Sequence, residues 1–356
     1  MARLGDYVNI KTGKLDANAS CENGAYPFFT CSVIPLKIDT YSYDCECVLV
    51  AGNGDLNVKY YNGKFDAYQR TYIIESNNKS VLSVPYLYCF LDKYVETLRK
   101  QSIGGVIKYI KLGNLTEAEI PLCDIKEQSE IVKTLEKANS LIADRKTQLS
   151  KFDELVKARF VEMFGNCKNR VVINDLCSII TDGTHQPPNF QNEGIPFIFV
   201  SNLANNTVTY NSEKFISDET YNELIKRTPI EIGDILLTTV GSYGHPAVVV
   251  ENRKFLFQRH IAYLKPIHNL VNSFYMHSAM LSPDVQRQIE EKVKGIAQKT
   301  LNLSEIRKII IPVPSIEEQN AFEVFIKQVD KSKFAVQQSL DKLETLKKAL
   351  MQKYFG

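Results

Sequence analysis

Apolar side chains recur at alternating spacings of four and three residues along two stretches of the chain, residues 127–164 and 318–355. Neither stretch contains proline or glycine, so nothing in either interrupts a helix. This spacing is typical of helices that pack on another helix along one stripe. We therefore predict two helices of about 38 residues, each roughly 57 Å long. Their predicted pairing residues are Ile131, Leu135, Leu149, Phe152 and Val156 in the first helix and Ile326, Val336, Leu340, Leu343 and Leu350 in the second.

Charged residues interrupt both stripes, at Arg145 and Arg159 in the first and at Lys333 and Lys347 in the second. The interruptions do not fall at equivalent positions. One alternative is that each helix packs only on the domain before it. If the helices instead pair about a pseudo-two-fold axis, they form an antiparallel coiled coil with one domain at each end.

The remaining segments are rich in short runs of β-branched and aromatic residues, such as 48–50, 71–74, 197–200, 235–237 and 247–250. Glycine- and asparagine-rich turn sequences separate these runs, and a few helical segments lie between them. We therefore predict an α+β protein in which a mixed α/β domain precedes each long helix.

The two halves of the chain repeat one another. Ile120-Pro121, Glu127-Gln128 and Phe164-Gly165 recur as Ile311-Pro312, Glu318-Gln319 and Phe355-Gly356 at one constant offset, without a gap from Gly104 and Gly295 onward. The earlier parts match more loosely: Tyr26-Pro27-Phe28 resembles Ile195-Pro196-Phe197, and Gln69-Arg70 resembles Gln258-Arg259. Such a repeat indicates two copies of one unit. The predicted segments are a first domain (1–124), a first helix (125–165), a second domain (166–315) and a second helix (316–356).

Composition limits the class of protein only broadly. The chain is 44% hydrophobic and 24% charged, with a formal net charge of +2, which is typical of a folded globular protein. Net charge therefore does not point to nucleic acid, and a DNA-binding function must depend on local patches. The eight cysteines form no Cys-x-x-Cys pair, so we expect free thiols in a reducing cytoplasm and no metal site. We also expect neither a signal peptide nor a membrane span.

Sequence motifs of enzymes are missing or incomplete. No phosphate-binding loop of the type G-x-x-x-x-G-K-[ST] and no G-x-G-x-x-G motif occurs. Gln186-Pro187-Pro188-Asn189 differs at both ends from the loop of amino-methyltransferases, and Pro283-Asp284 has the wrong spacing to Glu290 for a nuclease. The five histidines are scattered. We therefore predict a non-catalytic chain.

The duplicated tail resembles that of the specificity subunits of type I restriction-modification systems. The residues that carry the resemblance are Ile120-Pro121 through Phe164-Gly165 and their repeat at Ile311-Pro312 through Phe355-Gly356, together with Ala67-Tyr68-Gln69-Arg70-Thr71 and Thr181-Asp182-Gly183-Thr184-His185. It covers essentially the whole chain, and its strength comes from the set in order rather than from any one motif.

This resemblance implies that each domain is a target-recognition domain that reads half of a split, asymmetric sequence in double-stranded DNA. It implies that the helices set the gap between the halves and dock two modification subunits. Those partners would carry S-adenosylmethionine and methylate adenine, and restriction subunits would use ATP and Mg²⁺ to cleave DNA. The chain itself would bind no cofactor.

Candidate DNA-binding residues are polar side chains of the turns, because Arg, Asn and Gln read base edges in the major groove. They are Asn53, Asn57, Gln69 and Arg70 in the first domain and Thr184, His185, Gln186, Ser242, His245, Gln258 and Arg259 in the second. For the two Gln-Arg pairs, a buried strand with a structural arginine is an alternative. Lys59, Lys64, Lys254 and Lys265 are candidates for phosphate contacts.

Two other functions fit the sequence less well. The chain could be a coiled-coil scaffold whose two domains bind protein or RNA, or it could itself be a nuclease or methyltransferase. Indifference to duplex DNA would favour the first, and unaided modification of DNA would favour the second.

Overall fold

The computed structural model describes residues 1–295 and 299–356. The described chain divides into two compact units, one formed by Met1–Lys146 with Gln338–Gly356 and the other by Thr147–Gln337. Each unit contains one mixed α/β body and one half of each long helix, α3 (Ile125–Phe164) and α9 (Ile316–Phe355). The boundaries of the compact units therefore fall within the two long helices and differ from the boundaries of the four predicted segments. The predicted α+β class, with a mixed domain before each long helix, is confirmed.

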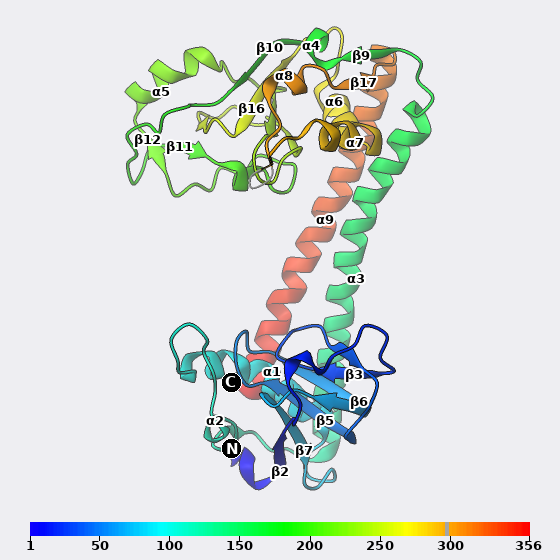
Figure 1. Cartoon of the computed structure of the whole chain (residues 1–356), viewed down its shortest axis with the longest axis vertical. Coiled ribbons are helices and arrows are strands. Elements are labelled where there is room, and N and C mark those ends of the chain that lie inside the picture. Colours follow the sequence, from blue (N-terminus) through cyan, green and yellow to red (C-terminus); the bar gives the residue numbers. More distant parts are fainter. Residues whose placement is uncertain (296–298) are drawn as a thin grey trace. The chain divides into compact units, whose positions relative to one another are not determined.

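The first body is built on a six-stranded sheet (Figure 1). In order across the sheet its strands are β2 (Val8–Thr12), β7 (Thr71–Ser76), β5 (Tyr43–Ala51), β6 (Val58–Ala67), β3 (Tyr26–Phe29) and β4 (Leu36–Ile38). All neighbours are antiparallel except β3 and β6, which run parallel. Outside the sheet, β1 (Ala2–Arg3) pairs with β8 (Glu119–Ile120), and the helices are α1 (Val84–Gln101) and α2 (Leu112–Thr116).

Both faces of this sheet are covered, which explains the continuous apolar run in β5. Val48 and Val50 pack in the core that includes α1, whereas Cys47 and Leu49 belong to a second cluster with Phe65. Because successive strand residues point to opposite faces, a strand buried on both sides needs apolar side chains throughout.

The second body repeats the strand pairings of the first, with additional helices. Its four-stranded sheet has the order β10 (Cys177–Asp182), β16 (Ile261–Pro266), β13 (Ile235–Thr238) and β14 (Pro246–Val248), and its three-stranded sheet has the order β12 (Phe215–Ile216), β11 (Ile195–Ile198) and β15 (Leu256–Phe257). β17 (Ile310–Pro312) pairs with β9 (Arg170–Val172). The helices are α4 (Ile173–Leu176), α5 (Asp218–Leu224), α6 (Ser273–Met280), α7 (Pro283–Lys292) and α8 (Leu303–Ile306).

Each strand pairing of the first body has a counterpart in the second. The single strand β6 corresponds to β14 and β15 together, because β14 pairs with β13 as β6 pairs with β5, and β15 runs parallel to β11 as β6 does to β3. The two registers confirm that Phe28 is equivalent to Phe197.

The expected match of Gln69-Arg70 to Gln258-Arg259 is wrong by one residue. Tyr68 pairs with Leu15 as Gln258 pairs with Thr184, and the amide of Gln69 donates to Leu15 as the amide of Arg259 donates to Thr184. Gln69 is thus equivalent to Arg259, and Arg70 to His260.

In each unit, segments of α3 and α9 complete the core. Ile131 and Leu135, from the first half of α3, lie in one cluster with Met351 and Phe355 from the last turns of α9. In the second unit, the Phe160 and Phe164 rings of α3 pack on Phe322 of α9 with centroid distances of 5.6 and 5.4 Å. The beginning of each helix therefore contacts the end of the other, so the segments run antiparallel. The alternative in which each helix packs only on the preceding domain is wrong.

Ion pairs link the same helix segments. Lys146 pairs with Glu344 at 3.1 Å in the first unit, and Lys333 pairs with Asp153 in the second. Lys333, a charged interruption of the stripe, is therefore satisfied across the helix pair. Of the ten predicted pairing residues none is exposed: Ile131, Leu135, Ile326 and Leu340 are buried, and Leu149, Phe152, Val156, Val336, Leu343 and Leu350 are half-buried.

The repeated Glu-Gln pair marks the start of each long helix. Gln128 is fully buried; its side-chain carbonyl accepts from the Ser83 amide, and its NH₂ donates to the carbonyls of Val81 and Cys123. Gln319 makes the same three contacts in the second body, with the amide of Asn272 and the carbonyls of Leu270 and Pro314. These glutamines join the helix start to the chain before α1 or α6, so the repeat preserves a structural contact.

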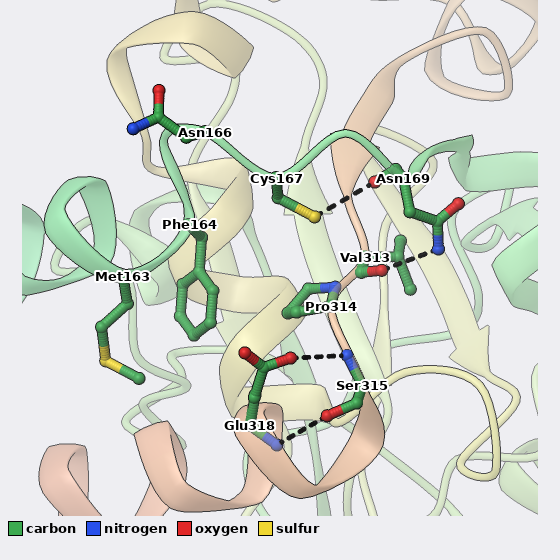
Figure 2. A pocket seen from close by; sticks show the side chains of 9 residues that line it. All are labelled: Met163, Phe164, Asn166, Cys167, Asn169, Val313, Pro314, Ser315 and Glu318. Atoms are coloured by element: carbon green, nitrogen blue, oxygen red, sulfur yellow. Dashed lines mark hydrogen bonds between the residues drawn. The ribbon is translucent and has the colours of Figure 1, made fainter.

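Figure 2 shows where the end of α3 meets the start of α9 in the second unit, around a hollow of about 460 Å³. Ser315 and Glu318 form a capping box, in which each side chain accepts from the other's backbone amide at 3.3 and 3.0 Å. The Asn169 side chain donates to the Val313 carbonyl at 2.8 Å. The turn after α3 is therefore tied to the strand before α9.

Three structural features bear on the broad class of protein. The eight cysteines are free thiols, of which Cys47, Cys89 and Cys177 are buried. Within residues 1–295 and 299–356, no three His, Cys, Asp or Glu side chains gather as a metal site would require. None of the described helices has the length and apolarity needed to cross a membrane.

Candidate nucleic-acid interface

Four loops of the first body meet at one end of its sheet. We call them the loop cluster: residues 13–25 after β2, 52–57 between β5 and β6, 68–70 between β6 and β7, and 102–111 between α1 and α2. Backbone hydrogen bonds join them in series. The Gln69 amide donates to Leu15 at 2.9 Å, the Gly52 amide to Arg70 at 2.8 Å and the Gly54 amide to Lys108 at 2.9 Å.

The second body has the same loop cluster, made of the segments 183–194, 239–245, 258–260 and the described residues 293–295 and 299–300. The Arg259 amide donates to Thr184 at 3.0 Å, the Thr239 amide to His260 at 2.9 Å and the Gly241 amide to Lys299 at 3.2 Å. In both bodies, loops that are far apart in the sequence are thus held side by side by backbone contacts. We call these shared backbone contacts the common frame. The frame is the same in both bodies, whereas the side chains that it carries differ.

A glycine opens each cluster because two backbones approach closely there. A Cβ on Gly13 would lie 2.1 Å from the Ala67 carbonyl oxygen, and one on Gly183 would lie 2.3 Å from that of Phe257. These distances leave no room for a side chain. In the motif Thr181-Asp182-Gly183-Thr184-His185, the close approach of two backbone segments therefore requires the glycine.

The predicted residues of the first body all lie in its loop cluster. Asn53 is half-buried and pairs through its backbone with Tyr109. The Asn57 side chain is used internally, since its NH₂ donates to the carbonyls of Cys31 and Asp55. Gln69 and Arg70 are exposed in a turn, so the alternative of a buried strand is wrong for this pair.

The side chains of Gln69 and Arg70 differ in whether another side chain of the protein binds them. The Gln69 NH₂ donates to the Asp16 carboxylate at 2.8 Å, which fixes its direction. In Arg70 the backbone carbonyl is used, by the Gly52 amide and the Cys31 thiol. Among the described residues, no acidic side chain forms an ion pair with the Arg70 guanidinium, so that group is available to a ligand.

In the second body, His185 and Gln186 line a surface cleft of about 580 Å³ between the segment 183–189 and the end of α5. Asp182 accepts from Arg227 and lies 2.9 Å from the Nε2 of His185. The Asp182 carboxylate thus contacts both the Arg227 guanidinium and the His185 ring, which line the cleft. Thr184 lies beside them and pairs through its backbone with Gln258.

Of the remaining predicted residues, Ser242 and Arg259 are exposed and His245 and Gln258 are half-buried. The Nδ1 of His245 lies 3.0 Å from the Oδ1 of Asn206, whose backbone carbonyl contacts the Nε2 of His277 at 3.1 Å. Asn206 has a φ of 56°, a strained value for a residue other than glycine. Two histidines thus support this backbone conformation.

The four lysines proposed for phosphate contacts are mostly engaged elsewhere. Lys254 pairs with Asp218 at 2.8 Å, and Lys265 pairs with Glu231 at 2.7 Å near the far end of β16. Lys59 is half-buried, which lowers its pKa by desolvation, and donates to Asn57. Lys64 lies over the Tyr41 ring, 4.7 Å from its centroid.

The loop between α1 and α2 and the equivalent residues after α7 also belong to the loop clusters, although neither carries a candidate residue predicted from the sequence. Lys108 and Lys299 stand at equivalent places, because each backbone carbonyl accepts from the glycine of the neighbouring loop, Gly54 or Gly241. Both lysines are exposed. The signal was present, since they fall within the part of the repeat that aligns without a gap.

Comparison with known proteins identifies the family. The family model described as "Type I restriction modification DNA specificity domain" matches residues 1–151 and 169–347. The chain is 36% identical over 154 residues to the EcoDI type I restriction enzyme specificity subunit of Escherichia coli, covering 43% of this chain and 34% of that one. It is 23% identical over 307 residues to the EcoBI specificity subunit of E. coli, covering 76% and 64%.

These matches span less than two thirds of either E. coli relative. Among solved structures, the S subunit of a type I restriction-modification system from M. genitalium is similar with a TM-score of 0.60 and 16% identity, over 100% of this chain and 95% of that one. At that identity the structural likeness supports the fold.

Proposed function

Because the chain belongs to the family of type I restriction-modification DNA specificity domains, we propose that it is the subunit that supplies DNA sequence specificity to such a system. One observation carries the proposal: the same cluster of four loops occurs on both bodies, with different side chains on a constant backbone frame. A frame of this kind suits two readers that contact one type of ligand at different sequences.

Each loop cluster would read one half of a bipartite target. In the first cluster Gln69 and Arg70 are exposed, and in the second Arg259 is exposed and Gln186 lines the cleft. Arginine matches the acceptors of guanine, and glutamine matches the donor and acceptor of adenine, in the major groove. Since the two clusters differ in chemistry, the target is asymmetric.

The paired helices would set the distance between the half-sites. The two ion pairs and the aromatic contacts fix the antiparallel direction within each unit. A helix of 40 residues extends roughly 60 Å, which exceeds one turn of duplex. The gap in the target then follows from the length of the helices rather than from contacts with the bases between.

Catalysis would come from partners. Two modification subunits carrying S-adenosylmethionine would methylate adenine, and restriction subunits would use ATP and Mg²⁺. Leu155 of α3 and Leu346 of α9 occupy equivalent places and are 45% and 50% exposed. Because the repeat places these two exposed leucines at equivalent positions, we propose that each contacts one modification subunit. The free thiols fit a cytoplasmic location.

The experiment is to express the chain with its modification subunits in cells that lack the system and to map methylated adenines by single-molecule sequencing. We expect one bipartite motif. Arg70→Ala should change only one half of that motif and Arg259→Ala only the other. The proposal fails if the purified chain alone methylates or cleaves DNA, or if no motif depends on it. Indifference of the assembled complex to duplex DNA in a competition gel shift would favour a scaffold for protein or RNA.

A further inference from the structure

The segment between α1 and α2 is an ordered hairpin at the edge of the first loop cluster. Ile103 and Tyr109 exchange backbone hydrogen bonds of 3.0 and 2.9 Å. Gly104 has a φ of 116°, and a Cβ there would meet the Ile107 carbonyl oxygen at 2.6 Å. The narrow turn therefore requires glycine, and its tip consists of residues 105–107.

Backbone contacts attach this hairpin to the neighbouring loop of the cluster. The Ile110 amide donates to the Gly52 carbonyl, and the Gly54 amide donates to Lys108, both at 2.9 Å. Asn53, between these two glycines, pairs with Tyr109. The position of the hairpin relative to a predicted base-reading residue is thus fixed.

The second body attaches the residues that flank the equivalent segment, Lys294 and Thr300, in the same way. Lys294 and Thr300 exchange backbone hydrogen bonds, and the Leu301 amide donates to Thr239 at 2.8 Å. Gly295 has a φ of 108°, close to that of Gly104. Since the attachment recurs on a body whose side chains differ, it belongs to the common frame.

The hairpin and the equivalent stretch of the second body both lie in sequence without a negative charge. No Asp or Glu occurs between Glu96 and Glu117, where the cations are Lys100, Lys108 and Lys111 besides Arg99, which is paired with Glu96 and Asp55. None occurs between Glu291 and Glu305 either, and Lys292, Lys294 and Lys299 stand there. Among the described residues, neither Lys108 nor Lys299 has an ion-pair partner. A basic loop next to the readers matches the phosphate backbone in charge.

The tip of the first hairpin is apolar and points into solvent. The Val106 side chain is fully exposed and Ile107 is 63% exposed. These two adjacent aliphatic side chains give an otherwise basic loop, attached beside a predicted base-reading residue, an exposed apolar contact surface. The thymine methyl group is the apolar feature of the major groove, and aliphatic side chains recognise it.

We propose that this hairpin is a further specificity-determining element of the first body, in which Val106 and Ile107 contact thymine methyl groups while Lys108 contacts a phosphate. The inference rests on the proposed function. It adds that the first half-site requires a thymine, or an adenine on the other strand, beside the bases read by the loop of Asn53. Lys299 would make the equivalent phosphate contact in the second body.

The test uses the complex of the chain with its modification subunits and compares two double variants. V106S/I107S removes the apolar tip. The matched control is I232S/V250S, which alters one isoleucine and one valine of similar exposure, 57% and 55%, at the opposite end of the second body's sheet. Methylated adenines are mapped in the host genome, and binding is measured on duplexes that carry the wild-type motif.

We expect V106S/I107S to bind the motif about tenfold more weakly, the cost of one mismatched base pair. It should accept other bases at one A·T position of a single half-site, with the other half-site and the control unchanged. Lys108→Ala should weaken binding to all sequences and reduce the slope of log affinity against log salt by about 0.9.

Three results would overturn the inference without touching the proposed function, provided the wild-type complex methylates one bipartite motif. The first is a motif and affinity for V106S/I107S equal to those of the control. The second is a uniform loss of affinity with the base preference kept at every position. The third is loss of a modification subunit from the purified complex, which would assign the tip to a protein contact. If the wild-type complex shows no motif, the proposed function itself fails.

Discussion

Replacing Gln128 by alanine should loosen the first body without affecting the second. The side chain is fully buried and holds three backbone groups, the Ser83 amide and the carbonyls of Val81 and Cys123. Alanine leaves all three without a partner. Each buried group so orphaned costs about 1–3 kcal/mol. Because Val81 is itself 40% exposed and water can reach part of the site, we take the low end, about 3 kcal/mol in total.

The equivalent change, Gln319→Ala, provides an internal comparison. It breaks the same three contacts in the second body, with Asn272, Leu270 and Pro314, so its cost should be similar. Gln338→Ala, at an exposed position of α9, is the matched control and should change stability by less than about 0.5 kcal/mol.

Hydrogen–deuterium exchange followed by mass spectrometry separates the two bodies. A loss of about 3 kcal/mol speeds exchange through local opening by roughly 100-fold. In Q128A the acceleration should appear in peptides that contain Ser83, and in Q319A in peptides that contain Asn272. The explanation fails if either variant accelerates both regions equally, or if Q128A exchanges like Q338A.

Three further predictions concern the close backbone approach at Gly183, the half-buried His277 and the partner subunits. Gly183→Ala forces a Cβ to within 2.3 Å of the Phe257 carbonyl oxygen; it should lower the melting temperature and weaken DNA binding, and a variant with wild-type affinity would contradict the close approach. Desolvation of the half-buried ring holds the pKa of His277 below its ordinary value. The unfolded chain therefore binds more protons near pH 6, and the free energy of unfolding should fall as the pH drops from 7 to 5, by less than about 1.4 kcal/mol per pH unit from this group. Urea titrations should show a flatter pH profile for His277→Gln, and an unchanged slope would refute the assignment. Leu155→Asp and Leu346→Asp should each remove one modification subunit from the complex, measured by native mass spectrometry, and retention of both subunits in both variants would exclude this docking site.

The regular elements could be predicted from the chain because their signals are local. The four–three spacing and the lack of proline and glycine predicted α3 and α9, whose ends at Phe164 and Phe355 also close the repeat. The β-branched runs predicted strands such as β5 and β13. In each case the burial of one stripe or of both strand faces is recorded directly in the order of apolar residues.

The loop cluster could be predicted only in part, since strand topology brings its segments together. Gln69 was matched to Gln258 because both are glutamine. In the structure the residue equivalent to Gln258 is Tyr68, since Tyr68 pairs with Leu15 as Gln258 pairs with Thr184. Register in a sheet is set by hydrogen bonds between strands that are distant in the sequence. A shift of one residue barely changes the similarity of the two sequences, but it turns each side chain to the other face. Lys108 aligns with Lys299 in the ungapped part of the repeat, but only the tertiary contacts of their loops show that both stand beside the predicted readers.

The ends of the helices explain why charged residues are tolerated along their apolar stripes. The Phe355 ring packs on Tyr86 with centroids 5.1 Å apart, and Phe164 packs on Tyr275 at 5.0 Å. Both tyrosines also donate to a repeated proline, Tyr86 to Pro121 and Tyr275 to Pro312, each at 2.8 Å. In the first unit the end of α9 therefore packs on the body that precedes α3. In the second unit the end of α3 packs on the body that precedes α9. Because these two contacts already fix the direction and register of the pair, the stripe between them does not have to specify either. Lys333 can therefore stand in the stripe and reach Asp153, at little cost to specificity.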